Sequence, residues 1–396
     1  MKAACAPYAE FPETEYRSRF EKAQQVMAER GLDTLLVTGK ENVVYFTGLQ
    51  TIGWMSKHRP LGAILLRDID TPILVIPESL FSVAEATSWI EDVRYWGGTR
   101  FPDVPRDPID AIVAAIVDLS LNRARVGMEL GYGQRLAMPQ NDYEALKRAL
   151  PALEIVDGSD ALWQLRMVKS PAEVEAIRAA CNATSTAFET AFEAIHEGMT
   201  ERELGRIILQ EMSQTGYPPG FIMVRSGRDK YKMINVPPFD KPLNKGDLVV
   251  VDAGATYKDY WADFMRMASI GGPTEEQRRY FEADLAAQQA GVEVIRPGIP
   301  GKRIFEAAAA TLKDLGMEQQ ARIERIGHGV GLDVHEPPSL DGKAEFQLEP
   351  GMILTVEPIF TDPEGKIGNF ALEDMVLVTE DGYEILSTFP KELWIA

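Results

Sequence analysis

The sequence predicts two domains: an α/β domain over residues 1–165, then an α+β domain over residues 166–396 that is built from two similar halves. The length of 396 residues is that of about two to three domains. Apolar runs of strand length alternate with segments of helical spacing up to residue 160. Beyond that point, a helix pair followed by two strands that carry acidic residues occurs twice, which indicates pseudo-twofold halves.

The first domain follows the α/β pattern of alternating strands and helices. Strands are predicted over residues 32–39, 62–68, 71–78, 92–96, 124–130 and 153–158. Helices are predicted over residues 14–29, 78–90, 108–121 and 138–150. The first helix has apolar residues at helical spacing and ends at Gly31. Residues 160–170 are interpreted as the connection to the second domain.

Three capping boxes mark helix starts in the second domain. In each, a Ser or Thr precedes a Glu or Gln by three residues: Ser170 and Glu173, Thr200 and Glu203, Thr274 and Gln277. The predicted helices cover residues 171–195, 200–216, 274–294 and 301–315. Strand-like runs cover residues 221–227, 247–266, 351–360 and 370–378.

The composition restricts the partners. The formal net charge of −19 argues against binding to nucleic acid or to an anionic membrane, because both require an excess of lysine and arginine. No apolar run reaches the length of about 18–20 residues that spans a membrane. The two cysteines, Cys5 and Cys181, form no CxxC motif and are compatible with a reducing compartment. We therefore expect a cytoplasmic protein.

Acidic residues interrupt the apolar strands of both halves. Asp252 ends the run Leu248–Val251, and Asp263 lies between Ala262 and Phe264. A buried carboxylate needs a positively charged partner. That partner is either a basic side chain in a salt bridge, with Arg266 as the local candidate, or a metal ion. The second half supplies Glu357 and Glu373 in equivalent runs.

Four carboxylates brought together by the two halves would need about two divalent cations for neutrality. His328, in a glycine-rich segment that we interpret as a loop, offers an imidazole to the same site. Carboxylates with a single imidazole suit manganese, iron, cobalt or zinc better than copper. His335 follows seven residues later, and its alternative interpretation is a histidine that stabilises the loop.

These motifs resemble those of the pita-bread metallohydrolases: creatinase, Xaa-Pro dipeptidase (prolidase), aminopeptidase P and methionine aminopeptidase. The resemblance covers nearly the whole chain, with a creatinase-type N-terminal domain before a pita-bread catalytic domain. The five ligands stand in order in VDAG, YWADFMR, GHGVGLDVHEPP, VEP and LED: Asp252, Asp263, His328, Glu357 and Glu373. Creatinase itself lacks this metal set, so the motifs favour the metal-dependent members.

The resemblance implies a role for each ligand. Asp263 and Glu373 would bridge two divalent ions, with manganese expected and cobalt, zinc or iron(II) as alternatives. Asp252 would bind one ion, and His328 and Glu357 the other. Water between the ions would be the nucleophile, and Glu357 would also move the proton. His335 matches the family histidine that contacts the substrate near the scissile bond.

Two positions depart from the pattern of the proline-specific peptidases. Asn235 occupies the place of a histidine that follows an SG motif, here Ser226 and Gly227. Ala371 occupies the place of an arginine two residues before the last ligand. Both changes leave the metal ligands intact but alter the groups available to hold the substrate, with Asn235 as a candidate contact.

A loop of the first domain bears on the substrate. In creatinase-like relatives the corresponding loop reaches an active site, commonly across a dimer interface. Here it carries Trp54, His58 and Arg59, which suit a carboxylate or a small polar ligand, although a plain surface loop is an equal alternative. The resemblance implies a homodimer.

The preferred hypothesis is a dinuclear metallohydrolase that cleaves an amide C–N bond in a small substrate, with Xaa-Pro dipeptides as the default. The alternative is a creatinase-like hydrolase or lyase that uses the same metal site on a non-peptide molecule, such as an amidine, a ureido compound, an N-acyl amino acid or a betaine-like compound. A catalytically silent binding protein is a third hypothesis, which the retention of all five ligands disfavours.

Overall fold

The computed structural model describes residues 6–56 and 60–396, and the chain divides into two compact units, Met1–Arg166 and Met167–Ala396. Among the described residues, no helix is both long enough and apolar enough to cross a membrane.

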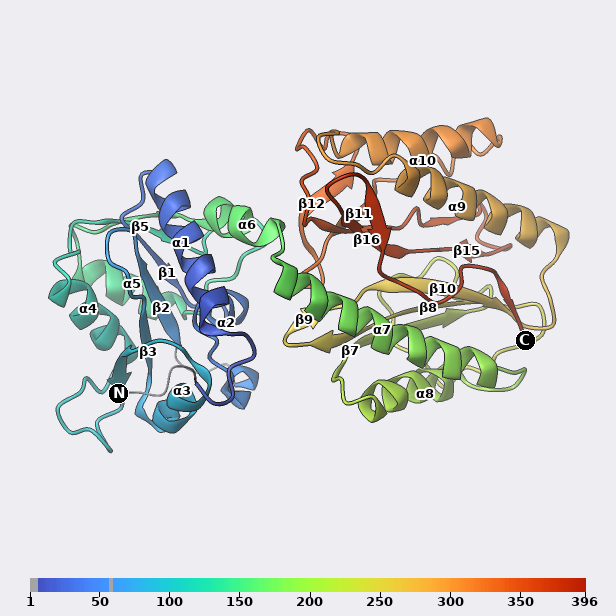
Figure 1. Cartoon of the computed structure of the whole chain (residues 1–396). Helices are drawn as coiled ribbons and strands as arrows, with labels where there is room; N and C mark the ends of the chain where they lie inside the picture. The colour runs from blue at the N-terminus through green and yellow to red at the C-terminus, as the bar shows by residue number, and fades with distance from the viewer. Residues whose placement is uncertain (1–5, 57–59) are drawn as a thin grey trace. The chain divides into compact units, whose positions relative to one another are not determined.

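The first unit is built on a six-stranded sheet with the strand order β4-β3-β2-β1-β5-β6 (Figure 1). The strands are β1 (Thr34–Val37), β2 (Gly62–Leu66), β3 (Ile73–Pro77), β4 (Asp92–Trp96), β5 (Arg125–Met128) and β6 (Glu154–Asp157). Only β2 runs antiparallel to its neighbours. All four residues of β1, Thr34 and three hydrophobic residues, are buried, because both faces of the sheet are covered by helices.

Helices cover both faces of this sheet (Figure 1). On one face, α4 (Pro108–Asp118) and α5 (Gln140–Ala149) bury apolar residues against the strands. Figure 1 shows α1 (Glu13–Glu29) and α2 (Lys40–Thr47) on the other face. The α/β class predicted for this part of the chain is therefore confirmed.

The structure adds local detail to the predictions for the first unit. The boundary between the two units falls within residues 160–170, and this connection is largely helical, because α6 (Ser159–Met167) occupies most of it and buries Leu162 and Leu165. The helix predicted over 78–90 is a 3-10 turn, η2 (Glu78–Leu80), followed by the short α3 (Phe81–Thr87). Sequence patterns also missed α2 and the 3-10 turn η1 (Ile52–Met55), which are too short to show a helical period.

The second unit contains two five-stranded sheets, each with a helix pair. The first sheet consists of β7 (Pro219–Ser226), β8 (Leu248–Tyr257), β9 (Tyr260–Trp261), β10 (Phe264–Ser269) and β18 (Trp394–Ile395). The second consists of β11 (Arg325–Gly329), β12 (Glu336–Asp341), β13 (Ile353–Val356), β16 (Asp374–Val378) and β17 (Tyr383–Ile385). The short β14 (Phe360–Thr361) and β15 (Asn369–Phe370) pair with each other.

The helix pairs of this unit lie outside its strands (Figure 1). The first sheet packs on α7 (Pro171–Ala194) and α8 (Glu201–Gln214), and the second on α9 (Glu275–Glu293) and α10 (Lys302–Asp314). All three predicted capping boxes form at the starts of α7, α8 and α9. One apolar core lies between the first sheet and α7 and α8, whereas the other joins α9, α10 and the second sheet with residues of β8 and β10, so the two sheets are in contact through it.

Candidate metal centre

The five predicted ligands lie in the second unit, at or beside strands of its two sheets. Asp252 lies within β8, and Asp263 directly precedes β10. His328 lies on β11, whereas Glu357 directly follows β13 and Glu373 directly precedes β16. The structure brings their ligand atoms into three groups, each within 4.8 Å: Asp252, Asp263 and Glu373; His328, Glu357 and Glu373; Asp263, His328 and His335.

His328 lies on a strand, so its placement in a loop was wrong. The neighbouring glycines serve close strand packing rather than a turn. At Gly327 (φ +152°), a Cβ atom would lie 2.0 Å from the carbonyl oxygen of Thr355. His328 Nδ1 lies 3.0 Å from the carbonyl oxygen of Gly329. A proton on Nδ1 satisfies that carbonyl and leaves Nε2 as the ligand atom, 3.3 Å from Glu357 Oε1.

Three carboxyl groups of this cluster, those of Asp252, Asp263 and Glu373, are buried close to other acids, which raises their pKa values. Burial, and then the charge of Glu357, raises the pKa of Asp252 to about 7. Burial and the neighbouring acids raise the pKa values of Asp263 and Glu373 well above their ordinary values. Without a cation, ionised carboxylates this close together would repel one another, and the raised pKa values reflect that repulsion and the burial.

Unpaired oxygen atoms show that the cluster fits metal ions. Asp252 Oδ1 and both carboxylate oxygens of Glu373 are buried and accept no hydrogen bond from the described residues. Buried carboxylate oxygens without partners are costly, and divalent cations with oxygen and imidazole ligands are the partners that such a set suits. The residues present therefore fit divalent metal ions.

The salt-bridge alternative for Asp252 and Asp263 was wrong. The guanidinium of Arg266 is buried on the other side of β10, where Nη2 donates to Asp374 Oδ1 at 2.8 Å. It also donates to the carbonyl oxygens of Phe389 and Glu373. Arg266 follows Asp263 by three residues. Because side chains alternate along a strand, the two side chains point to opposite faces.

The remaining predicted residues of the second unit have different surroundings. His335 and Asn235 are exposed and line the cavity of about 370 Å³ that contains Asp252, Asp263 and His328. The His335 ring lies 4.2 Å from the His328 ring, centre to centre. Asn235 has φ +53°, a left-handed conformation that asparagine tolerates well. Ala371 is fully buried in the apolar core of the second half.

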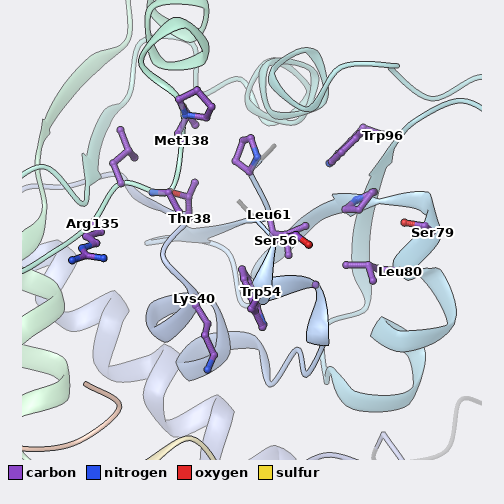
Figure 2. A pocket seen from close by; sticks show the side chains of 16 residues that line it. Thr38, Lys40, Trp54, Ser56, Leu61, Ser79, Leu80, Trp96, Arg135 and Met138 are labelled. Carbon is purple, nitrogen blue, oxygen red and sulfur yellow. The ribbon is translucent and has the colours of Figure 1, made fainter. Parts of the chain in front are cut away.

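The predicted loop of the first domain is described only in part, because His58 and Arg59 lie outside the described residues. Trp54 lies on η1 and lines a cavity of about 700 Å³ within the first unit (Figure 2). Thr38, Ser56 and Met138 line the same cavity, and the indole nitrogens of Trp54 and Trp96 are buried there without a described acceptor.

Arg225 is a residue of the site that the sequence interpretation missed. It lies on β7, its side chain is buried, and it lines the same cavity as Asp252 and Glu357. Burial lowers the pKa of its guanidinium, and the charges of Asp252 and Glu357 oppose that shift. A charged residue inside the apolar run FIMVRSG was the available signal, the same one that identified Asp252 in LVVVD.

Two family models match the chain. Metallopeptidase family M24 matches residues 175–380, and the creatinase/prolidase N-terminal domain matches residues 19–168. The chain is 30% identical to an Xaa-Pro dipeptidase of Pyrococcus furiosus, over 95% of this chain and 99% of that relative.

Solved structures have the same fold as this chain. The prolidase of Pyrococcus horikoshii OT3 superimposes with a TM-score of 0.81 at 27% identity, covering 95% of this chain and 99% of that one. The dipeptidase PepE of Mycobacterium ulcerans also gives 0.81 at 27% identity, covering 98% and 99%. The predicted combination of a creatinase-type domain and a pita-bread catalytic domain is confirmed.

Proposed function

The chain belongs to metallopeptidase family M24, and on that premise we propose that it is a metal-dependent dipeptidase that hydrolyses Xaa-Pro dipeptides. One observation carries the proposal. Four buried carboxylates and an imidazole lie within reach of shared cations, with unpaired oxygens on Asp252 and Glu373. This cluster occurs in a chain that aligns over nearly its full length with an Xaa-Pro dipeptidase.

We assign the two ions to the groups that the ligand atoms form. Asp252 would bind one ion, and His328 with Glu357 would bind the other. Asp263 and Glu373 would be shared, because each lies in one group with Asp252 and in another with His328. When bound, the ions would lower the pKa of water and polarise the scissile carbonyl group. Manganese is the metal we propose, with cobalt, zinc and iron(II) as alternatives.

The chain's own residues would orient the peptide and move the proton. Glu357 would take the proton of the attacking water as the new C–O bond forms. It would return that proton to the leaving nitrogen as the C–N bond breaks. His335 would donate a hydrogen bond to the substrate beside that bond, because it faces the cavity next to His328. Asn235 and, from the first domain, Trp54, His58 and Arg59 are proposed as further substrate contacts.

Assembly and location are also part of the proposal. We propose a homodimer in the cytoplasm, supported by the family of the chain and by its low cysteine content. Sedimentation of the purified protein at micromolar concentration should give the mass of two chains; a single chain mass would contradict this part.

The experiment that tests the function removes and returns the metal. Protein stripped with a chelator, and shown by elemental analysis to lack metal, should not cleave Ala-Pro, and Mn²⁺ should restore cleavage. Asp252→Asn should lose both metal and activity, because it removes a charged ligand. Asp240→Asn is the matched control, since Asp240 is exposed and pairs with Arg202 at the surface. Full activity of the stripped protein would overturn the metal requirement.

The creatinase-like alternative on a non-peptide molecule is not favoured, because an Xaa-Pro dipeptidase, a prolidase and a dipeptidase match the chain over nearly its whole length. Assays of Ala-Pro and Gly-Pro separate the two hypotheses. Turnover of these dipeptides by the metal-loaded protein would support the dipeptidase hypothesis. The absence of turnover would favour the creatinase-like hypothesis instead.

A further inference from the structure

Arg225 carries a buried positive charge whose hydrogen-bonding capacity is mostly unused. Its residue exposure is 7%. One contact is made by Nη1, which donates to the carbonyl oxygen of Met233 at 3.4 Å. Nε and Nη2 are buried and have no partner among the described residues. A buried guanidinium with two unpaired donors is costly, which indicates that its partner comes from outside the protein.

The strand register places this guanidinium beside the metal centre. Met223 on β7 pairs with Asp252 on β8, and β7 and β8 are neighbours in the first sheet (Figure 1). Because side chains alternate along a strand, Arg225 lies on the same face as Met223 and Asp252. Val224, on the opposite face, packs into the apolar core under α7 and α8.

The acids of the centre do not use these donors. No hydrogen bond or ion pair joins Arg225 to Asp252 or Glu357 in the described part of the chain, although their charges act on it. Two divalent ions would neutralise the four carboxylates, which leaves the charge of Arg225 for an anion from solution. The planar fork of a guanidinium suits a carboxylate, which it can bind through two parallel hydrogen bonds.

We propose that Arg225 is a specificity-determining residue that binds the free C-terminal carboxylate of the substrate through Nε and Nη2. This inference rests on the proposed function, because it names the part of a dipeptide that the site recognises. It restricts cleavage to the last peptide bond of a substrate, because only there does the C-terminal carboxylate lie within one residue of the scissile bond, as it does in every dipeptide. Arg225 also supplies a positive charge in a chain whose position 371 is an alanine, where the proline-specific peptidases usually have an arginine.

The test compares Ala-Pro with its C-terminal amide, which differs only in the group that Arg225 would bind. Wild-type protein loaded with Mn²⁺ should prefer the acid. Arg225→Met should lose on the order of 100-fold in kcat/KM for Ala-Pro, mainly through KM, as expected for a lost charged contact. Its kcat/KM for the amide should change by less than about threefold. Arg225→Lys should recover part of the preference, because it restores the charge without the fork.

Two controls separate this role from a structural one. Arg325 lines the same cavity but is exposed, so Arg325→Met should keep the preference for the acid. Elemental analysis should find wild-type metal content in Arg225→Met. Equal losses on acid and amide, reduced metal content, or a preference abolished by Arg325→Met instead would each overturn the inference. If Arg225→Met does not fold, Arg225→Lys and Arg225→Gln provide the same comparison.

Binding measured without turnover separates this inference from the proposed function. Calorimetry with L-proline and prolinamide should show tighter binding of the acid to wild-type protein and no preference in Arg225→Met. If the metal-loaded protein cleaves neither peptide but keeps this preference, the proposed function fails and the carboxylate site stands. If it binds both compounds equally or neither, the carboxylate site is rejected whatever the result of the activity assay.

Discussion

At the scale of single residues, Asp284 shows how costly a buried acid becomes without a cation. It lies on α9 and is fully buried. Its Oδ2 accepts a hydrogen bond from the backbone N–H of Leu372 at 2.9 Å, while Oδ1 has no partner among the described residues. Burial raises the pKa of Asp284 well above its ordinary value of 3.8, and the Leu372 contact opposes that shift only partly.

We predict that Asp284→Asn stabilises the protein at neutral and alkaline pH. An acid with a raised pKa in the folded state binds its proton more tightly when folded, so its contribution to stability falls as pH rises above the unfolded pKa. Asparagine keeps the acceptor for Leu372 and removes the charge. The free energy of unfolding of Asp284→Asn should exceed that of the wild-type protein by about 1 kcal/mol or more at pH 8, with a smaller difference at pH 4.

Urea unfolding from pH 4 to pH 8 measures this difference. Glu282→Gln is the matched control, because Glu282 is exposed on the same helix and should show little change. A difference between Asp284→Asn and wild type that does not grow with pH would contradict the assignment of a raised pKa.

At the scale of elements, a buried ion pair connects β10 of the first half with β16 of the second. Arg266 and Asp374 are each about fully buried, and Asp374 also accepts hydrogen bonds from Ser387, Gln288 and Lys391. Opposite charges lower the pKa of Asp374 despite its burial. The pair therefore holds together the two strands that begin beside Asp263 and Glu373.

We predict that Asp374→Asn costs about 3–5 kcal/mol, because it leaves the charge of Arg266 buried with only neutral partners. The comparison is Glu384→Gln, which removes a part-exposed ion pair with Arg178 and should cost less than about 1 kcal/mol. Urea unfolding of both variants should be measured on metal-free protein. Otherwise a shift of the adjacent ligand Glu373 could change the free energy of unfolding through metal binding. Similar losses in the two variants would contradict a dominant role for the buried pair.

At the scale of the whole molecule, all five proposed ligands belong to the unit Met167–Ala396. Metal binding should therefore stabilise that unit and leave the unit Met1–Arg166 unchanged. We predict that removal of metal lowers the melting temperature of one calorimetric transition by roughly 5–10 °C, because ligand at 100 times its Kd contributes about 2.7 kcal/mol.

The transition of the first unit can be identified independently. Leu35→Ala removes a fully buried side chain from β1 and should lower only the melting temperature of its own unit. If chelation shifts the transition that Leu35→Ala also shifts, the two units unfold together and this prediction is wrong.

Local chemistry made a large part of this molecule predictable. The capping boxes at Ser170, Thr200 and Thr274 depend on residues three positions apart, and all three form. The acids were recognisable because a charge inside an apolar strand is rarely without a partner. Arg225 shows the same pattern, because it follows the apolar run FIMV directly before Ser226 and Gly227.

The sequence alone was sufficient for the helix starts, the alternation of strands and helices, the two halves and the presence of acids inside apolar strands, because each can be recognised from residue patterns along the chain. Only the tertiary structure could show that Arg266 pairs with Asp374, that His328 lies on a strand and that Arg225 lies on the same strand face as Asp252. These facts depend on cross-strand register and on the contact between two sheets. Register is decided by the packing of residues far apart in sequence, which no local pattern contains.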